Sequence, residues 1–238
     1  MRSKIVPITN VARLAEAGEM LLTRSPGMPG MGLCCGPSGY GKSTAIAWLA
    51  TRQHGVYVRA MATSTPTSLL DAITRELNIA PRARIAQTVD AIVGKLAETG
   101  RPLFVDEADY VVGQARLIDT LRDVHDLSSV PVILIGMEGI DRRISLSPQL
   151  SGRMAQWVHF QPASIEDARL LAKELCEVTV AEDLVAELHT RSKGTVRNFV
   201  VGLGRIEQHA KSRGNSKIAL ADWPRGTDFF LGSPRGQN

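Results

Sequence analysis

The stretch from Gly36 to Ser43 constrains the fold of this chain more than any other part of the sequence. It reads G-P-S-G-Y-G-K-S and fits the phosphate-loop pattern G-x-x-x-x-G-K-[ST]. In such a loop, successive backbone N–H groups point at one phosphate chain, Lys42 reaches the β- and γ-phosphates, and the Ser43 hydroxyl holds Mg²⁺. The pattern needs a strand before it and a helix after it. Residues 31–35 are apolar and residues 44–52 favour a helix, which argues against an ordinary glycine-rich turn.

The sequence therefore predicts a site for the phosphates of a nucleotide. The predicted binding residues are consecutive: Gly36, Pro37, Ser38, Gly39, Tyr40, Gly41, Lys42, Ser43 and Thr44.

A second element with carboxylates lies downstream, where residues 102–109 read P-L-F-V-D-E-A-D. A strand here delivers Asp106 at its carboxyl end, beside the phosphate loop, where it can orient the Mg²⁺ shell. Glu107 follows and is predicted to project toward the γ-phosphate, where a carboxylate can polarise an attacking water. This pair favours a hydrolase, because many phosphate-loop kinases need no such glutamate.

Composition and length are compatible with one large domain, or with a core and a smaller domain. The chain has 238 residues, is 44% hydrophobic and has a net charge of +4, which permits a nucleic-acid partner without requiring one. No apolar run reaches membrane-spanning length and no basic-then-apolar leader is present, so we expect a cytoplasmic chain without membrane partners. The cysteines Cys34, Cys35 and Cys176 lack metal-ligand spacing, and the five histidines are scattered and indicate no site.

Strands and helices alternate along the first two thirds of the sequence. Apolar runs predict strands at residues 31–35, 56–60, 102–106, 130–136 and 157–160. Helical periodicity lies between them, for example after Pro66 and from Ile85 to Gly100. This α/β alternation predicts a five-stranded parallel sheet flanked by helices, with the ligand at the carboxyl ends of the strands.

After Pro162 the sequence changes character. Residues 164–167 resemble a capping box, and three helical patterns follow at about 164–177, 181–190 and 195–211, with no strong strand. We therefore expect an ATPase-type core over residues 1–162, a small helical lid over 163–223 and a flexible tail over 224–238. Within the tail, Phe229, Phe230 and Leu231 are candidates for docking onto the rest of the chain.

Two arginines are candidates for stabilising the charge that develops when a γ-phosphate is hydrolysed. Arg153 lies just before the last predicted strand, and Arg197 lies at the start of the third lid helix. An arginine brought to the γ-phosphate accelerates hydrolysis by about 10³–10⁵-fold. A solvated surface position is the alternative for each of them.

The phosphate loop, the Asp106–Glu107 strand end, Arg153 and Arg197 occur in an order that resembles AAA+ ATPases. Within that group the chain is similar to the DNA-transposition ATPases of the phage Mu B and TniB kind. The finer resemblance depends on residues 8–10 with the helix after them, residues 30–33 before the phosphate loop, and residues 132–136 leading toward Arg153. It spans roughly residues 8–210.

The resemblance implies ATP and Mg²⁺ as ligands and a role for each site residue. Lys42 and Ser43 become the phosphate and Mg²⁺ residues, Asp106 supports Mg²⁺, and Glu107 activates water. Arg153 matches a finger offered to a neighbouring subunit's nucleotide, and Arg197 matches a lid arginine that contacts the phosphates in cis. Thr9 and Asn10 match the segment that lines the adenine pocket.

The resemblance also implies partners and a setting. Members of this group bind double-stranded DNA without sequence specificity, assemble on it as ATP-dependent rings or helical filaments, and present it to a cognate transposase. The expected setting is the cytoplasm of a bacterial host, if the chain is encoded by a phage.

Two departures from the family pattern matter. Met137 replaces the polar residue usually found after the fourth strand, which puts the sensing of the γ-phosphate, and hence the hydrolysis rate, in doubt. The chain also begins close to its ATPase core, so we expect no additional N-terminal DNA-binding domain. DNA contact then falls on basic residues of the core, for which the candidates are Arg82, Arg84, Arg142 and Arg143, although each one alone also fits a solubilising surface.

The sequence thus predicts an ATPase that assembles on DNA and selects transposition targets. The first alternative is a helicase- or clamp-loader-like DNA-remodelling AAA+ ATPase. A small-molecule kinase is the alternative from another class, and Met137 leaves open a module that binds nucleotide without hydrolysing it. A GTPase is disfavoured, because no N-K-x-D guanine motif is present.

Overall fold

A computed structural model describes residues 1–80, 82–224 and 226–230 of the chain. These residues form two compact units, each described here by itself. The sheet unit consists of Arg13–Pro37 and Lys42–Phe160. The helical unit consists of Met1–Ala12, Ser38–Gly41 and the described residues from Gln161 onward.

The sheet unit is built on a five-stranded parallel sheet, which confirms the predicted fold class. Its strands are β1 (Met31–Cys35), β2 (Val56–Arg59), β3 (Leu103–Asp106), β4 (Val132–Gly136) and β5 (Met154–His159). Their order across the sheet is β2-β3-β4-β1-β5, and every neighbouring pair runs parallel. All carboxyl ends therefore meet at one edge, which is where ligands bind in sheets of this kind.

The three central strands carry the core of the sheet unit. Every residue of β1, β3 and β4 is buried, as expected for parallel strands covered on both faces. β4 lies between the phosphate-loop strand β1 and the acid-bearing strand β3. This order separates Lys42 and Asp106 by one strand at the shared edge.

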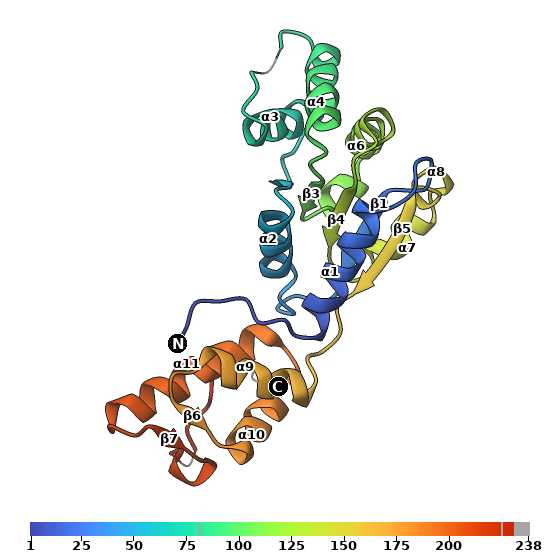
Figure 1. The fold of residues 1–238 in the computed structure, drawn as a ribbon. Coiled ribbons are helices and arrows are strands. Elements are labelled where there is room, and N and C mark those ends of the chain that lie inside the picture. The colour runs from blue at the N-terminus through green and yellow to red at the C-terminus, as the bar shows by residue number, and fades with distance from the viewer. Residues whose placement is uncertain (81, 225, 231–238) are drawn as a thin grey trace. The chain divides into compact units, whose positions relative to one another are not determined.

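The helices of this unit connect the strands. They are α1 (Thr9–Leu22, whose first turn belongs to the helical unit), α2 (Lys42–Arg52), α3 (Pro66–Glu76), α4 (Ile85–Thr99), α5 (Asp109–Val112), α6 (Ala115–Ser128), α7 (Ile140–Ser145) and α8 (Pro148–Ser151). α2 contacts β2, β3 and β4, α7 contacts β1, and α3, α4 and α6 pack against one another (Figure 1).

Local sequence explains where α3 begins and where α4 ends. Thr65 caps the N-terminus of α3 through its side chain, and Pro66 occupies the first turn, where its missing N–H costs no hydrogen bond. α4 ends at Gly100, whose backbone is left-handed with φ 64°. The sequence predicted the start of α3 from Pro66 and the end of α4 from Gly100.

The helical unit contains α9 (Ile165–Leu175), α10 (Glu182–Ser192), α11 (Val196–Ser212) and a short 3₁₀ helix at Leu220–Asp222. The predicted capping box is confirmed, since Ser164 accepts from the backbone of Asp167 and the Asp167 carboxylate accepts from the backbone of Ser164. The sequence predicted no strong strand in this region, and the two strands found there are short. β6 (Thr179–Val180) and β7 (Lys217–Ile218) pair in parallel, although each has only two residues and gives no periodic signal.

The start of the predicted tail packs against the helical unit. Phe229 is buried and stacks on Trp223, with ring centroids 5.1 Å apart. Phe230 is tilted against Phe229 at 6.5 Å. Leu231, Arg225 and residues 232–238 lie outside the described residues.

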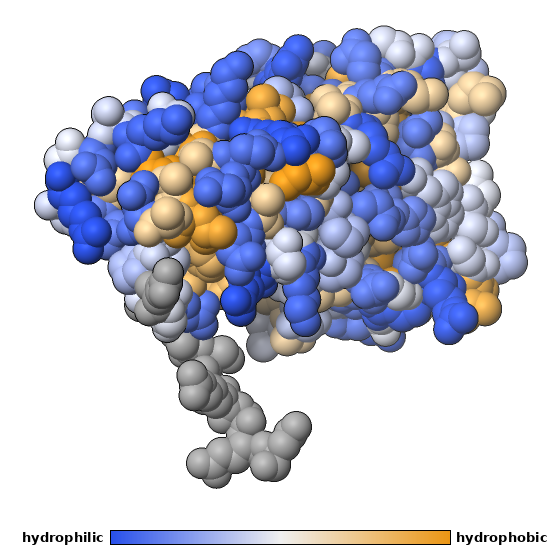
Figure 2. Space-filling model, turned by 90° about the horizontal axis from the view of Figure 1, so that it is seen from below, coloured by the Kyte–Doolittle hydropathy of each residue, from blue (hydrophilic) through white to orange (hydrophobic). Residues whose placement is uncertain are grey.

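Surface composition fits a chain that exposes polar groups. Among the described residues, no helix combines the length and apolar character that crossing a bilayer requires. The face shown in Figure 2 is mostly hydrophilic, and its hydrophobic residues appear in separate patches between polar ones.

Candidate nucleotide site

The phosphate loop joins the buried strand β1 to α2, as the sequence predicted. Three of its glycines have positive φ: Gly36 (150°), Gly39 (83°) and Gly41 (88°). At Gly36 a Cβ atom would also lie 2.8 Å from the carbonyl oxygen of Phe160. The loop conformation therefore requires glycine at this position, both for its backbone angle and for the space around it.

Lys42 is buried at the start of α2, with 9% of its surface exposed. Its ammonium donates to the carbonyl oxygens of Gly36 (2.5 Å) and Pro37 (2.8 Å), both of which are uncharged. Among the residues that the structure describes, no carboxylate lies within ion-pair distance of it. Burial lowers the pKa of Lys42 below its usual value, and an anionic ligand in the loop would counteract that effect.

Asp106 ends β3 and is also buried. Its Oδ2 accepts a hydrogen bond from the Tyr57 hydroxyl at 2.6 Å, and its Oδ1 accepts one from the Glu107 backbone N–H at 2.9 Å. Burial, together with Asp106, raises the pKa of Tyr57, so the phenol stays a hydrogen-bond donor. The carboxylate is fixed in orientation at the sheet edge, as a residue that supports Mg²⁺ must be.

Glu107 has an unusual backbone for a residue that follows a strand. Its φ is 55°, in the left-handed region that costs non-glycine residues energy. The other described non-glycine residues with positive φ follow helix C-termini: His54, Asn78, Ser129 and Lys193. Strain of this kind is concentrated at functional sites, which supports the prediction that Glu107 has a chemical role.

Arg59 pairs with Glu107. Its Nη2 donates to Glu107 Oε1 at 3.0 Å, and 65% of the arginine side chain is exposed. Arg59 ends β2, where it lies opposite Asp106 in the strand register. The proposed water-activating carboxylate is therefore bound by an exposed surface side chain and not by a residue of the buried core.

Met137 follows β4 directly, where the sequence lacked the expected polar residue. Its sulfur lies 3.9 Å from the Lys42 ammonium, and a thioether is only a weak acceptor. The Met137 backbone N–H donates to Asp109 Oδ2 at 2.7 Å. Arg143 pairs with the other oxygen of Asp109 and also donates to the Asp109 carbonyl at 3.3 Å.

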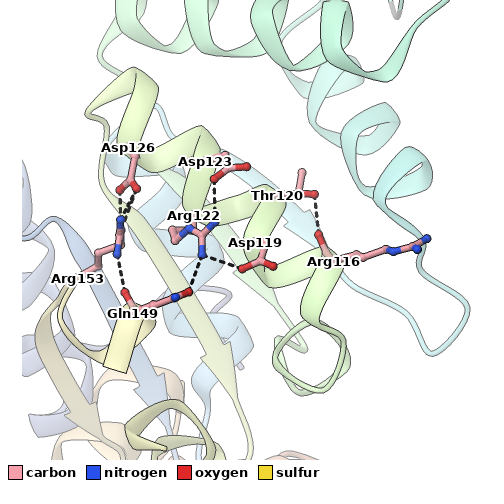
Figure 3. Close-up of polar contacts among 8 residues, drawn as sticks. All are labelled: Arg116, Asp119, Thr120, Arg122, Asp123, Asp126, Gln149 and Arg153. Carbon is pink, nitrogen blue, oxygen red and sulfur yellow. Dashed lines mark hydrogen bonds and ion pairs between the residues drawn. The ribbon is translucent and has the colours of Figure 1, made fainter. Parts of the chain in front are cut away.

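Arg153, the predicted finger, is bound within its own chain (Figure 3). Its Nε donates to both carboxylate oxygens of Asp126, at 2.7 and 3.0 Å, and its Nη2 donates to Oδ2 at 2.5 Å. Its Nη1 donates to the Gln149 carbonyl at 2.6 Å. These hydrogen bonds lower the pKa of Asp126. Arg153 is one-third exposed, so a neighbouring molecule can reach it, but only after the pair with Asp126 opens.

The predicted adenine-lining residues belong to the helical unit, and their polar atoms are already used. Thr9 donates from its backbone N–H (2.8 Å) and its hydroxyl (2.9 Å) to Asp167 Oδ1. Asn10 is buried, donates to the Gln161 carbonyl at 2.8 Å and accepts from the Gln161 N–H at 3.1 Å. Both residues thus fasten the N-terminal segment in place.

Arg197 lies exposed in the first turn of α11. Its backbone N–H donates to the carbonyl of Gly39 at 2.9 Å, within the helical unit. The remaining predicted basic residues differ from one another. Arg82, Arg84 and Arg142 are exposed, whereas Arg143 is engaged with Asp109.

The part of the chain that carries the phosphate loop is similar in sequence to a known family. Residues 27–144 match the family model described as AAA domain. This stretch is an AAA domain. It contains the whole phosphate loop and the Asp106–Glu107 pair, whereas Arg153 and Arg197 lie beyond it. No curated protein is similar enough in sequence to count as a relative.

Solved structures share the AAA domain's fold. Orc1 from Aeropyrum pernix, solved in complex with DNA, superposes with a TM-score of 0.64 at 16% identity, and the match covers 93% of this chain. Cdc6p from Pyrobaculum aerophilum gives 0.66 at 17% identity over 93% of this chain and 68% of its own. RuvB from Thermotoga maritima, described as a Holliday junction branch migration motor, gives 0.60 at 18% identity over 91% of this chain and 67% of its own. The chain spans 64% of the length of the Orc1 chain.

Sequence reasoning missed three partners of the predicted site residues: Tyr57, Arg59 and Asp126. Tyr57 and Arg59 are two residues apart on β2, so their side chains point to the same face of the sheet. Knowing that β2 and β3 are neighbours would have placed them beside Asp106 and Glu107. Asp126 lies 27 residues from Arg153 and gave no signal in the sequence.

Proposed function

We propose that this chain binds ATP with Mg²⁺ at the phosphate loop and hydrolyses it. The observation that carries the proposal is the buried Lys42 ammonium, whose hydrogen-bond partners among the described residues are all uncharged, at the sheet edge that also presents Asp106 and Glu107. A buried cation of this kind needs an anion, and a phosphate chain supplies one. Residues 36–44 would hold the phosphates, and Ser43 and Asp106 would hold Mg²⁺, which neutralises charge on the phosphate oxygens.

Each side chain of this site has a separate role in the proposed hydrolysis. Lys42 binds the phosphate chain, and Tyr57 fixes the orientation of Asp106. Glu107 accepts the proton of the attacking water, for which it must leave Arg59. Because that ion pair is largely exposed, opening it costs about 1 kcal/mol or less. The pair therefore permits turnover.

The outer residues have roles that we propose from the family resemblance. Arg153 acts on the nucleotide of a neighbouring subunit after it leaves Asp126, and Arg197 contacts the phosphates in cis. Thr9 and Asn10 shape the adenine pocket through the segment that they fasten, because their polar atoms already bind Asp167 and Gln161. Arg153 in trans requires that the chain assemble with copies of itself.

We further propose that the assembled ATPase binds duplex DNA without sequence preference and presents it to a cognate transposase. The resemblance to the Mu B and TniB group supports this role, and the exposed Arg82, Arg84 and Arg142 supply positive charge. A DNA-remodelling ATPase of the helicase- or clamp-loader type is the second candidate. It is favoured by the fold shared with Orc1 in complex with DNA and with the RuvB motor.

ATP turnover with and without duplex DNA, and with no small-molecule acceptor, tests the core of the proposal. We expect the wild type to hydrolyse ATP. Lys42→Ala should lose both ATP turnover and nucleotide binding. Glu107→Gln should bind ATP but hydrolyse it about 10²–10⁴-fold more slowly, since an amide cannot accept the water's proton. Turnover that needs an acceptor would instead support a kinase, and wild-type turnover in Glu107→Gln would refute the assigned base.

Assembly and DNA binding need separate measurements. Turnover per chain should rise with protein concentration, and a mixture of Arg153→Ala and Glu107→Gln should recover activity, because one intact composite site can form. DNA affinity should fall with salt at a log–log slope near −0.9 per phosphate neutralised on duplex DNA, and only with ATP present. Equal affinity with ATP, ADP and no nucleotide would refute ATP-dependent assembly. Stimulation of a transposase would support the transposition role. DNA unwinding or loading activity would support the DNA-remodelling role.

A further inference from the structure

Three side chains with metal-binding atoms come together at the carboxyl edge of the sheet. Cys35 ends β1, His159 ends β5, and Asp141 lies in the first turn of α7. One ligand atom from each of these residues lies within 4.8 Å of the other two. Sequence analysis indicated no metal site at the cysteines or histidines, because these three residues are far apart along the chain.

The backbone accounts for this convergence. Cys35 and His159 are direct partners in the parallel register of β1 and β5, so their side chains point to the same face of the sheet. On the other side of β1, Cys35 is paired with Gly136 of β4, and α7 begins four residues after Gly136. α7 contacts β1, which brings Asp141 over the end of that strand. The cluster therefore follows from strand order and register.

The spacing of the ligand atoms suits one tetrahedral metal ion. Asp141 Oδ2 and His159 Nε2 are 3.1 Å apart. Two such ligands bound to one Zn²⁺ at about 2.0–2.1 Å lie about 3.3 Å from each other. A thiolate bound at about 2.3 Å lies about 3.6 Å from its fellow ligands, so side-chain movements of about 1 Å complete the geometry.

The donor set and its exposure select the class of ion. A thiolate with an imidazole favours Zn²⁺ and similar transition metals, whereas Mg²⁺ prefers oxygen ligands. Cys35 is buried, but the side chains of Asp141 and His159 are 36% and 43% exposed. Solvent therefore reaches the cluster from the side of Asp141 and His159, which provides a path for the ion and room for a water as fourth ligand.

We propose that Cys35, Asp141 and His159 bind one divalent transition-metal ion of the zinc class. This site is separate from the Mg²⁺ position assigned to Ser43 and Asp106, since it shares no residue with it. It adjoins the phosphate loop, because Cys35 directly precedes Gly36. It does not depend on the proposed ATPase activity.

Cobalt provides a direct spectroscopic test. The nucleotide-free full chain is titrated with Co²⁺ in excess Mg²⁺, which occupies oxygen sites and leaves the thiolate site free. We expect a near-ultraviolet thiolate-to-cobalt charge-transfer band that saturates at one ion per chain. Cys35→Ser should abolish the band. Cys34→Ser is the matched control, since its buried thiol is adjacent in β1 and points to the opposite face.

Zinc affinity measured by competition with a coloured chelator completes the test. His159→Gln and Asp141→Asn should each weaken Zn²⁺ binding by at least about tenfold, the lower end of the loss seen when even an outer-shell partner is removed. Both positions are partly exposed, so these variants should keep the wild-type thermal midpoint in chelator, which separates loss of a ligand from misfolding. Wild-type protein without the cobalt–thiolate band, or a band that survives Cys35→Ser and disappears in Cys34→Ser or Cys176→Ser, would overturn the proposal.

Discussion

Removing Asp126 should release Arg153 and speed ATP hydrolysis between subunits. The arginine makes three contacts with this carboxylate, all between 2.5 and 3.0 Å, and must break them before it can reach a neighbouring molecule. Both side chains are about one-third exposed, so solvent screens the pair. Such a pair stabilises the closed position by about 1 kcal/mol at most. In Asp126→Ala we therefore expect a rise in turnover of up to about fivefold.

The assay is ATP turnover across a range of protein concentrations, for Asp126→Ala, Arg153→Ala and the wild type. Asp123→Ala is the matched control, because Asp123 lies on the same helix and pairs with Arg122 instead, at 3.2 Å. Both alanines remove an acid near the C-terminus of α6 and add helix propensity, so these effects cancel in the comparison. Arg153→Ala should lower turnover by about 10³–10⁵-fold.

Two results would refute this reasoning. If Asp126→Ala loses activity as Arg153→Ala does, the carboxylate positions the arginine for catalysis and does not restrain it. If Asp126→Ala and Asp123→Ala have the same turnover at every concentration, opening the pair is not a step on the way to the active assembly. Thermal midpoints should differ by no more than about 2–4 °C in any of these variants.

Three further outcomes are expected. Tyr57→Phe removes the hydroxyl that donates to the buried Asp106 carboxylate and should lower the free energy of unfolding, measured in urea, by about 1.5–3 kcal/mol. A loss below about 0.5 kcal/mol, which is the size of the experimental scatter, would contradict this hydrogen bond. Asn10→Ala removes two hydrogen bonds to the Gln161 backbone and should cost about 1–2 kcal/mol, whereas Asn198→Ala, on the exposed face of α11, should cost almost nothing. The folded-state pKa of Asp126 is depressed, so its pair stabilises the fold fully above the unfolded pKa of about 4. The stability difference between wild type and Asp126→Ala should therefore shrink as the pH falls below about 4 and be lost once the pH passes the lower folded pKa, as acid titration of unfolding would show.

The parts of the fold that the sequence predicted are those specified by neighbouring residues. The apolar runs of β1 and β4 are bounded by glycine, proline and polar residues, and α3 and α4 carry their own start and stop signals at Thr65 and Gly100. The phosphate loop is likewise continuous in sequence, so its glycines, Lys42 and Ser43 were recognised together.

The parts that sequence reasoning missed depend on which strands are neighbours. Tyr57 meets Asp106 only because β2 lies beside β3, and that order is not written in either strand. β6 and β7 are two residues each, too short for an alternating pattern, and residues 181–216 of the chain lie between them. Arg153 was identified by its place before β5, but its partner on α6 follows from tertiary packing alone.

The three cysteines of the chain can serve as native probes of unfolding by thiol labelling. Cys34, Cys35 and Cys176 are all buried, and burial raises the pKa of each thiol, so alkylating reagents find almost no thiolate to attack in the folded protein. Two of them report on the centre of the sheet and the third on α9. While β1 is folded, Cys34 and Cys35 point to opposite faces of the sheet, so the native protein does not lose these two thiols to a disulfide between them. Mass spectrometry of a pulse-labelled sample would thus time the opening of each unit separately, without any engineered probe.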